Sequence, residues 1–209
     1  MKRSRGSDHF RRIYDSSLDP WNMLGSRYEA TKYQHTLRML EGRHFTVGLE
    51  VGCSIGVLTS LLATRCNTLL AVDIVEAPLR LARARCADLP QVQFALMQAP
   101  QEWPDQLFDL VVLSEILYFL SPADIAYCAH RVADSTSPDS VVLLVNWLGE
   151  SDDPSTGNEA ADQFIESLAG RFHVDRAERA QQYRIDRLIR GARQASPHSG
   201  MSQANVEAA

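Results

Sequence analysis

The sequence has few cysteines, no long apolar run and no apolar stretch near its start. Its four cysteines form neither a C-x-x-C pair nor a cluster with histidine at metal-ligand spacing, a pattern that predicts free thiols and no bound metal. No apolar run in the chain reaches the roughly 18 residues that a membrane-spanning helix needs. Residues 1–9 are basic without an apolar core, which argues against a secretory signal. We therefore expect a cytoplasmic protein without a membrane span.

The chain has 209 residues, of which 45% are hydrophobic and 22% charged. This composition excludes a disordered, collagen-like or coiled-coil chain, and the length suits one domain with a full core. Residues 13–170 carry nine basic and 21 acidic side chains, whereas residues 1–12 and 171–193 are each basic. The acidic middle argues against a nucleic-acid partner and suits a small cationic ligand. The composition and the distribution of charge indicate no particular oligomeric state.

Strand-like and helix-like segments alternate from residue 46 onward, which is typical of an α/β fold with a parallel sheet. Residues 172–178 and 183–190 instead alternate apolar and polar side chains. That period predicts a half-exposed antiparallel hairpin with Arg184, Arg187 and Arg190 on its solvent face. The other strands are expected at residues 47–51, 68–73, 92–95, 108–113 and 141–145, and the helices at residues 56–65, 76–85, 122–133 and 158–169.

The two ends of the chain differ from this central part. Residues 1–45 contain the densest aromatic cluster, and we expect them to form a helical lid segment. Residues 46–192 are expected to form the α/β domain. Residues 193–209 have no aromatic residue and many Ser, Ala, Gly and Gln, which predicts a disordered tail.

A glycine-containing loop follows the first expected strand and opens a helix. It reads Glu50-Val51-Gly52-Cys53-Ser54-Ile55-Gly56, and its glycines allow a tight turn and the close approach of a ligand to the backbone. Asp73 ends the second strand, 21 positions after Gly52, where a carboxylate can hold both hydroxyls of a ribose. Ser54 and Val57 stand where a dinucleotide fingerprint has glycine, which argues against NAD. The remaining alternative is a turn that binds no ligand.

The string E-x-G-x-x-x-G, followed by an acidic residue at the end of the next strand, resembles motifs I and II of class I S-adenosylmethionine-dependent methyltransferases. The resemblance implies a Rossmann-like three-layer α/β sandwich, whose seven-stranded, mostly parallel sheet ends in an antiparallel hairpin. It also implies S-adenosylmethionine as cofactor and S-adenosylhomocysteine as product. Gln98 departs from the family, which usually has an acidic residue there to meet the adenine. The cofactor-binding residues that the resemblance implies in the sheet domain are Glu50, Gly52, Ser54, Gly56, Asp73, Ile74, Gln98, Ala99 and Ser114.

The end of the fourth expected strand should face the transferred methyl group, because ligands of open α/β sheets lie beyond the carboxyl ends of the strands. Glu115 and Tyr118 are the candidate catalytic residues there. Methyl transfer requires mainly alignment and exclusion of water, and a carboxylate can hold and orient an ammonium acceptor. Glu115 fits a helix cap or a surface carboxylate equally well. The strand ends offer no arginine for an acidic acceptor, which favours an amine or a hydroxyl.

The segment from residue 19 to residue 33 contains Trp21, Arg27, Tyr28 and Tyr33 ahead of the first strand. A segment in that position usually closes over the cofactor and excludes water, and aromatic faces suit a sulfonium cation. We expect Trp21, Arg27 and Tyr28 to contact the cofactor, the last two at its carboxylate. Tyr33 is a candidate substrate contact, or alternatively a structural residue of a helix packed on the sheet.

Four stretches of the sequence together resemble a family of rhizobial nodulation N-methyltransferases. They are this segment, D-P-W…S-x-Y-E-x-x-K-Y, then L-E-V-G-C-S-I-G, F-D-L-V-V-L-S-E-I-L-Y-F-L and Asn146-Trp147-Leu148-Gly149. The resemblance implies methylation of the free amine on the non-reducing-end glucosamine of a de-N-acetylated chitooligosaccharide, in Nod-factor synthesis. Asn146 and Trp147 are then candidate sugar contacts, whereas Asp152 and Asp153 are interpreted as part of a solvated connection. The alternatives are an O-methyltransferase of a small metabolite or glycan hydroxyl, a non-catalytic regulator that binds the cofactor, and, third, an NAD oxidoreductase.

Overall fold

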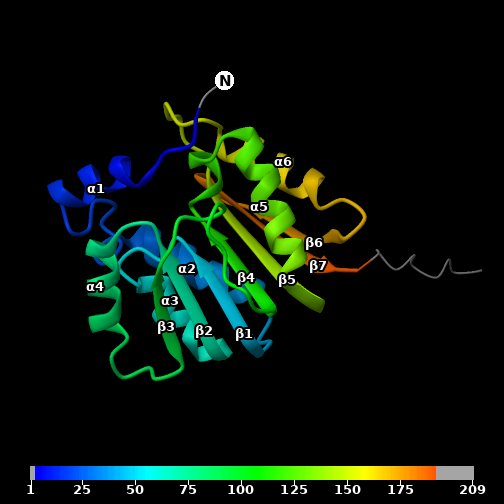
Figure 1. Cartoon of the computed structure of the whole chain (residues 1–209), viewed down its shortest axis with the longest axis horizontal. Coiled ribbons are helices and arrows are strands. Elements are labelled where there is room, and N and C mark those ends of the chain that lie inside the picture. Colours follow the sequence, from blue (N-terminus) through cyan, green and yellow to red (C-terminus); the bar gives the residue numbers. More distant parts are fainter. Residues whose placement is uncertain (1–2, 192–209) are drawn as a thin grey trace, which may run out of the picture.

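A single seven-stranded sheet runs through the centre of the computed structural model, which describes residues 3–191 (Figure 1). The strands lie in the order β3-β2-β1-β4-β5-β7-β6. Neighbouring strands are parallel except in the two pairs that β7 makes, with β5 and with β6. The predicted α/β class, sheet and C-terminal antiparallel hairpin are therefore confirmed. The predicted tail, residues 193–209, lies outside the described residues.

Each predicted strand and helix corresponds to an element of the structure. The strands are β1 (Phe45–Val51), β2 (Cys66–Asp73), β3 (Val92–Leu96), β4 (Phe108–Ser114), β5 (Thr136–Trp147), β6 (Phe172–Arg179) and β7 (Tyr183–Arg190). The helices are α1 (Ser7–Ser16), α2 (Arg27–Met39), α3 (Val57–Leu62), α4 (Glu76–Arg85), α5 (Pro122–Asp134) and α6 (Gly157–Ser167), with 3-10 turns at Ala63–Arg65 and Leu117–Phe119. Strand β5 begins at Thr136 rather than at residue 141, because Thr136 already pairs with Phe108 at the start of β4, ahead of an irregularity in the register.

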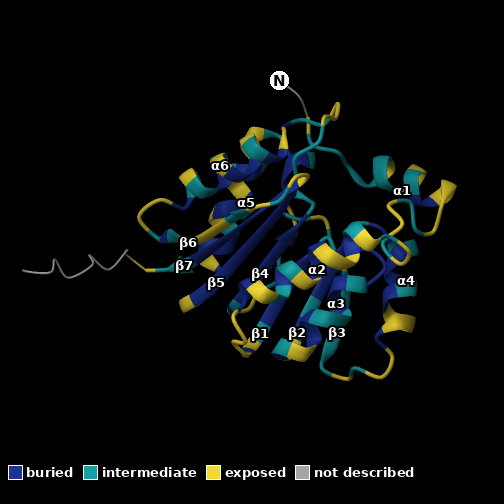
Figure 2. Ribbon diagram, turned by 180° about the vertical axis from the view of Figure 1, so that it is seen from behind, coloured by how far each residue is buried: buried dark blue, intermediate teal, exposed yellow. Residues whose placement is uncertain are grey.

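Helices cover both faces of the sheet, α5 and α6 on one face and α2 and α3 on the other (Figures 1 and 2). Alternate residues of the central strands supply the two cores, because successive side chains of a strand point to opposite faces. Val111 and Leu113 of β4 pack in the core under α5 and α6, whereas Leu110 and Val112 pack in the core under α2 and α3. Among residues 3–191, no helix is both long and apolar enough to cross a membrane.

The prediction that the arginines of the terminal hairpin face solvent is wrong. Strand β7 lies between β5 and β6 rather than at the edge of the sheet, and Arg184 and Arg187 are only 7% and 6% exposed. Arg184 donates to both carboxylate oxygens of Asp186 on the α6 side, and Arg187 donates to the carbonyl oxygen of Met39 at the end of α2. Arg190 donates to the carbonyl oxygen of Thr136. Arg184 and Arg187 are three positions apart and so lie on opposite faces of the sheet, and each is covered and paired with a carboxylate, Asp186 and Asp175 respectively.

Replacing Arg184 by methionine should lower the free energy of unfolding by about 3 kcal/mol, because it leaves Asp186 buried without a cation. The Asp186 side chain is 2% exposed and lies 2.8 Å from Arg184 Nε. Urea unfolding measures the change. The double variant R184M/D186N should recover most of the loss. The exposed Arg83–Glu76 pair supplies the control, since R83M should cost less than about 1 kcal/mol. Equal losses in R184M and R83M would contradict this account of the buried pair.

Candidate active site

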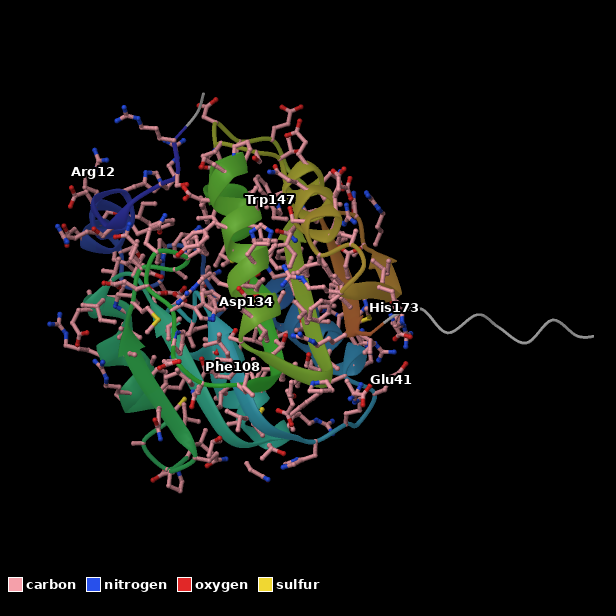
Figure 3. All side chains as sticks on the ribbon, turned by 45° about the vertical axis from the view of Figure 1, so that its right-hand side comes forward. Arg12, Glu41, Phe108, Asp134, Trp147 and His173 are labelled. Atoms are coloured by element: carbon pink, nitrogen blue, oxygen red, sulfur yellow. The ribbon has the colours of Figure 1, made fainter. Side chains whose placement is uncertain are left out.

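A cavity of about 750 Å³ lies at the carboxyl ends of the central strands, with residues of α1 and α2 among its walls. Figure 3 shows Trp147 at this end of the sheet and Phe108, where β4 begins, at the opposite end. The predicted site residues that line the cavity are Trp21, Tyr28, Tyr33, Glu50, Gly52, Ser54, Asp73, Ile74, Ala99, Ser114, Glu115, Tyr118 and Trp147. The topology thus gathers residues from the lid segment, the glycine loop and four strand ends around one space.

The glycine loop between β1 and α3 forms one wall of the cavity. Gly52 and Gly56 have φ values of 81° and 78°, a region that glycine enters without steric cost. A Cβ atom at Gly52 would lie 2.3 Å from Ile116 Cγ2, and one at Gly56 would lie 2.9 Å from Ala82. The first glycine therefore lets Ile116 pack closely against the loop, and the second lets α3 pack closely on α4. Gly56 itself does not line the cavity.

Two buried carboxyl groups, Glu50 and Asp73, stand beside this loop. Asp73 accepts hydrogen bonds from the backbone N–H groups of Ser54 and Val75, at 2.9 and 3.0 Å. Burial raises the pKa of Asp73 to about 6. Glu50 is 1% exposed, and burial raises its pKa to about 7. Its Oε2 atom has no hydrogen-bond partner among the described residues.

The lid segment contacts the glycine loop directly through Tyr14 of α1. The hydroxyl of Tyr14 lies 2.5 Å from Ser54 Oγ, and the two side chains are buried. The ring of Tyr14 packs edge-on against Trp21, with 5.5 Å between the centroids. Ser54 has a φ of 49°, a conformation that side-chain-bearing residues rarely adopt. Ser54 thus supplies the hydroxyl that meets α1.

A cluster of charged side chains, Glu29, Lys32 and Glu115, lies at the end of β4. Lys32 Nζ is 2.7 Å from Glu115 Oε1 and 3.0 Å from Glu29 Oε1. Glu115 Oε2 accepts two further hydrogen bonds, from the Tyr118 hydroxyl and from the backbone N–H of Trp147, both at 2.9 Å. Burial alone would lower the pKa of Lys32, but the carboxylates of Glu115 and Glu29 outweigh it and raise the pKa. Lys32 is therefore an ammonium ion at neutral pH.

The remaining predicted site residues lie outside the cavity lining. Arg27 is exposed at the start of α2, and Gln98 donates its backbone N–H to Glu102. Asn146 is fully buried in β5, and its amide nitrogen and oxygen have no hydrogen-bond partner among the described residues. Asp153 is not a solvated loop residue as interpreted above, because its carboxylate pairs with Arg5 Nε at 3.1 Å and is 14% exposed.

Sequence reasoning missed several residues that line the cavity. They include Tyr14, Glu29 and Lys32, and also Arg5, His9 and Phe10 from the first ten residues. Glu29 and Lys32 are three positions apart, which places them on one face of a helix. That spacing could have predicted the contact between Glu29 and Lys32 from the sequence. The partner of Lys32, Glu115, lies 83 positions away, and no local pattern indicates such a contact. Within residues 3–191, no group of three or more His, Cys, Asp or Glu side chains is placed to hold a metal ion.

Comparison with known proteins identifies relatives of the chain. Residues 5–139 match the family described as nodulation protein S (NodS). A nodulation protein S of Sinorhizobium fredii is 31% identical over 128 residues, which cover 60% of this chain and 59% of that protein. The ubiquinone biosynthesis O-methyltransferase of Pseudomonas paraeruginosa is 33% identical over 89 residues, 40% of this chain and 38% of that protein.

The fold also resembles that of a solved structure. The crystal structure of N-methyltransferase NodS from Bradyrhizobium japonicum in complex with S-adenosyl-L-homocysteine has a TM-score of 0.77 to this chain at 19% identity. The superposition covers 89% of this chain and 98% of that one. At this identity the likeness shows a shared fold. The sequence match to the Sinorhizobium fredii protein spans 59% of that protein's length.

The free energy of unfolding should fall as the pH rises, because burial raises the pKa of Glu50. A carboxyl group whose pKa is raised on folding favours the folded state most below its unfolded pKa, and that contribution is lost as the pH rises to the folded pKa. For Glu50 the window runs from the ordinary value of 4.5 to about 7, which corresponds to about 3 kcal/mol. E50Q stays neutral, so its stability relative to the unchanged protein should rise by about that amount between pH 4.5 and pH 7.5.

Urea unfolding at a series of pH values, without added ligand, measures this difference. Asp73 is present in both proteins, and its repulsion contributes to the raised pKa of Glu50 that the comparison measures. A stability difference that stays constant with pH would contradict the burial of Glu50 as a protonated acid.

Proposed function

Because the chain belongs to the nodulation protein S family, we propose that it is an S-adenosylmethionine-dependent N-methyltransferase. We propose as acceptor the free amine on the non-reducing-end glucosamine of a de-N-acetylated chitooligosaccharide, in Nod-factor synthesis. The observation that carries this proposal is the cluster of Glu29, Lys32 and Glu115, which lines the same cavity as the glycine loop and has one unit of excess negative charge. An acceptor ammonium group complements that charge.

The residues around the glycine loop fit S-adenosylmethionine. Asp73 uses one hydrogen bond on each carboxylate oxygen, so each oxygen keeps a lone pair for a ribose hydroxyl. The Tyr28 hydroxyl and Glu50 Oε2 are buried without partners among residues 3–191, and a ligand with hydrogen-bond donors and acceptors would satisfy both. Gly52 itself lines the cavity, with its backbone accessible to a ligand. A cationic ligand also suits two buried carboxyl groups.

When bound, this cofactor supplies an electrophilic methyl group on a sulfonium. The chain supplies alignment and exclusion of water, which account for most of the acceleration of such a displacement. Tyr14 contacts Ser54 of the glycine loop and packs against Trp21, and both line the cavity together with Tyr28. Glu115 and Tyr118 hold the acceptor end of the cavity, where a nitrogen nucleophile must be oriented.

The charge of the cavity supports an amine more than a neutral or acidic acceptor. Carboxylates of Glu29 and Glu115 face it from α2 and from the end of β4, and Asp153 faces it from the loop after β5. Lys32 and Arg5 are paired with these carboxylates and so offer no free cation to an anion. An N-acetylated glucosamine carries neither a positive charge nor a basic nitrogen, so the site should distinguish the two forms.

The alternative of methylation at a hydroxyl group is supported by the similarity to the ubiquinone biosynthesis O-methyltransferase. That relative matches 40% of this chain, a smaller part than the nodulation protein S family does. The alternative of a regulator that binds the cofactor without turnover predicts cofactor binding but no methylated product. We also propose a cytoplasmic location, because the four cysteines are free and buried, as expected in a reducing compartment.

The proposed reaction predicts a strict dependence on the free amine. Chitooligosaccharides with and without the non-reducing-end N-acetyl group should be incubated with S-adenosylmethionine, and methylated products identified by mass spectrometry. We expect methylation of the de-N-acetylated oligomer alone, with kcat/KM at least 100-fold above that of the acetylated one. Equal methylation of both oligomers would identify a hydroxyl acceptor, and binding without product would identify a regulator.

Asp73 should be required for the cofactor rather than for folding. D73A should weaken the binding of S-adenosylhomocysteine at least several-fold, because it removes a buried pair of hydrogen-bond acceptors. Asp109 supplies a matched control, since its carboxylate also accepts two backbone hydrogen bonds, from Thr46 and Val47, at the other end of the sheet. Titration calorimetry of D73A and D109A measures the two affinities. Equal losses in both variants would mean that Asp73 acts only through the fold.

A further inference from the structure

The ammonium group of Lys32 lies inside the proposed acceptor site and has no role in the reaction as described so far. Its side chain is 4% exposed and lines the cavity. Nζ is held by Glu29 and Glu115 and lies 5.0 Å from the ring centroid of Tyr28. Two carboxylates and an aromatic face are the features that recognise a cation. The chain has therefore placed its own cation where an acceptor ammonium group would also bind.

The hydrogen bonds around Glu115 have a fixed direction. Oε1 accepts from the Lys32 ammonium and Oε2 accepts from the backbone N–H of Trp147, and both groups can only donate. Glu115 is the acceptor in these contacts, and the Tyr118 hydroxyl donates its hydrogen to Oε2. The oxygen of Tyr118 then has only lone pairs left for the cavity. It is suited to accept a hydrogen bond from the N–H of an acceptor amine.

The net charge beside that position depends on Lys32. Glu29 and Glu115 carry two negative charges, and Lys32 reduces the total to one. An acceptor ammonium group has no lone pair and must lose one proton to water before its nitrogen can take a methyl group. Negative charge nearby attracts the ammonium form and opposes that loss, whereas positive charge nearby favours it. The lysine therefore has opposite effects on holding the ammonium group and on activating it.

We propose that Lys32 is the residue that sets the charge of the acceptor site, so that the acceptor amine loses its proton within the working pH range. The inference rests on the proposed N-methylation. Tyr118 Oη orients the nitrogen, and the cluster of Glu29, Lys32 and Glu115 carries enough negative charge to attract an ammonium group without trapping it. Without the lysine, two carboxylates would face the amine and stabilise its protonated form.

Other ionisable groups also face this cluster from the surrounding elements. Four tyrosines interact with members of the cluster: Tyr28 and Tyr33 of α2, Tyr118 of the 3-10 turn and Tyr183 of β7. Glu50 of β1 and Asp153 of the loop after β5 interact with Tyr33 and Tyr118 in turn. Glu50, whose pKa burial raises to about 7, is common to the unchanged protein and K32M. Burial raises the pKa of each of the four tyrosines, so they stay neutral in the working range. Asp153 is paired with Arg5. Lys32 is thus the cation in direct contact with both Glu29 and Glu115.

The test is the pH dependence of kcat with the de-N-acetylated oligomer, which reports the ionisation of the bound acceptor. K32M keeps an unbranched side chain one heavy atom shorter and removes its charge. We expect the apparent pKa on the acidic side of the kcat profile to rise by about one to two units, the effect of one charge a few ångströms away at an intermediate dielectric. Activity at pH 7 should fall by up to about 10-fold for a one-unit shift and up to about 100-fold for a two-unit shift, and it should recover at high pH.

Two variants separate charge from packing. K32R keeps the positive charge, so its apparent pKa should stay near that of the unchanged protein. E29Q/K32M returns the cluster to one negative charge and should restore the apparent pKa while still lacking the lysine. The double variant also avoids two unpaired buried carboxylates if K32M folds poorly. A residue with a merely structural role would lower kcat at every pH and leave the apparent pKa unchanged.

The outcomes distinguish this inference from the proposed function. An apparent pKa that does not move in K32M, or that stays raised in E29Q/K32M, overturns the role of Lys32 while N-methylation stands. Absence of amine methylation by the unchanged protein overturns the proposed function and with it this inference. Where a variant turns over too slowly, calorimetry of acceptor binding to the protein saturated with S-adenosylhomocysteine gives the ionisation of the bound amine directly.

Discussion

The carboxylate of Glu115 joins three elements that approach the cavity from different directions. It accepts a hydrogen bond from Lys32 of α2, one from Tyr118 of the 3-10 turn and one from the backbone of Trp147 at the end of β5. Glu115 has a φ of 60°, and its own N–H donates to the carbonyl oxygen of Val145. The sheet thus holds an unfavourable backbone conformation at the point where β4 ends. The position of α2 over the strand ends, and the shape of the acceptor end of the cavity, depend on this residue.

The two halves of the cavity use charge differently. Near the glycine loop, Glu50 and Asp73 are buried with raised pKa values. A bound cationic ligand would favour the ionised form of both carboxyl groups. Near Glu115, the charges are already balanced by Lys32 except for one negative unit. The first arrangement favours binding, and the second limits how tightly a cation is held. Both fit a protein that combines a sulfonium with an amine.

The parts of the fold that depend on local sequence were predictable. Apolar runs such as residues 108–113 identified the strands, and the spacing from Gly52 to Asp73 placed the two groups at neighbouring strand ends, which the parallel pairing of β1 and β2 brings together. Contacts between distant segments were not predictable in this way. The pairing of Lys32 with Glu115, and the covering of Arg184 by α6, depend on how whole elements pack. Arg27, next to Tyr28 in sequence, faces away because neighbouring residues of a helix point in different directions.

The contact between Tyr14 and Ser54 has a consequence for how the cavity opens. It joins α1 to the glycine loop through two hydroxyl groups, each of which water can hydrogen-bond equally well once they separate. The net cost of breaking such a contact is about 1 kcal/mol, far below that of separating a large apolar interface. The hydrogen bond between Tyr14 and Ser54 therefore fixes the direction in which α1 meets the glycine loop, while contributing little to the free energy that holds α1 there.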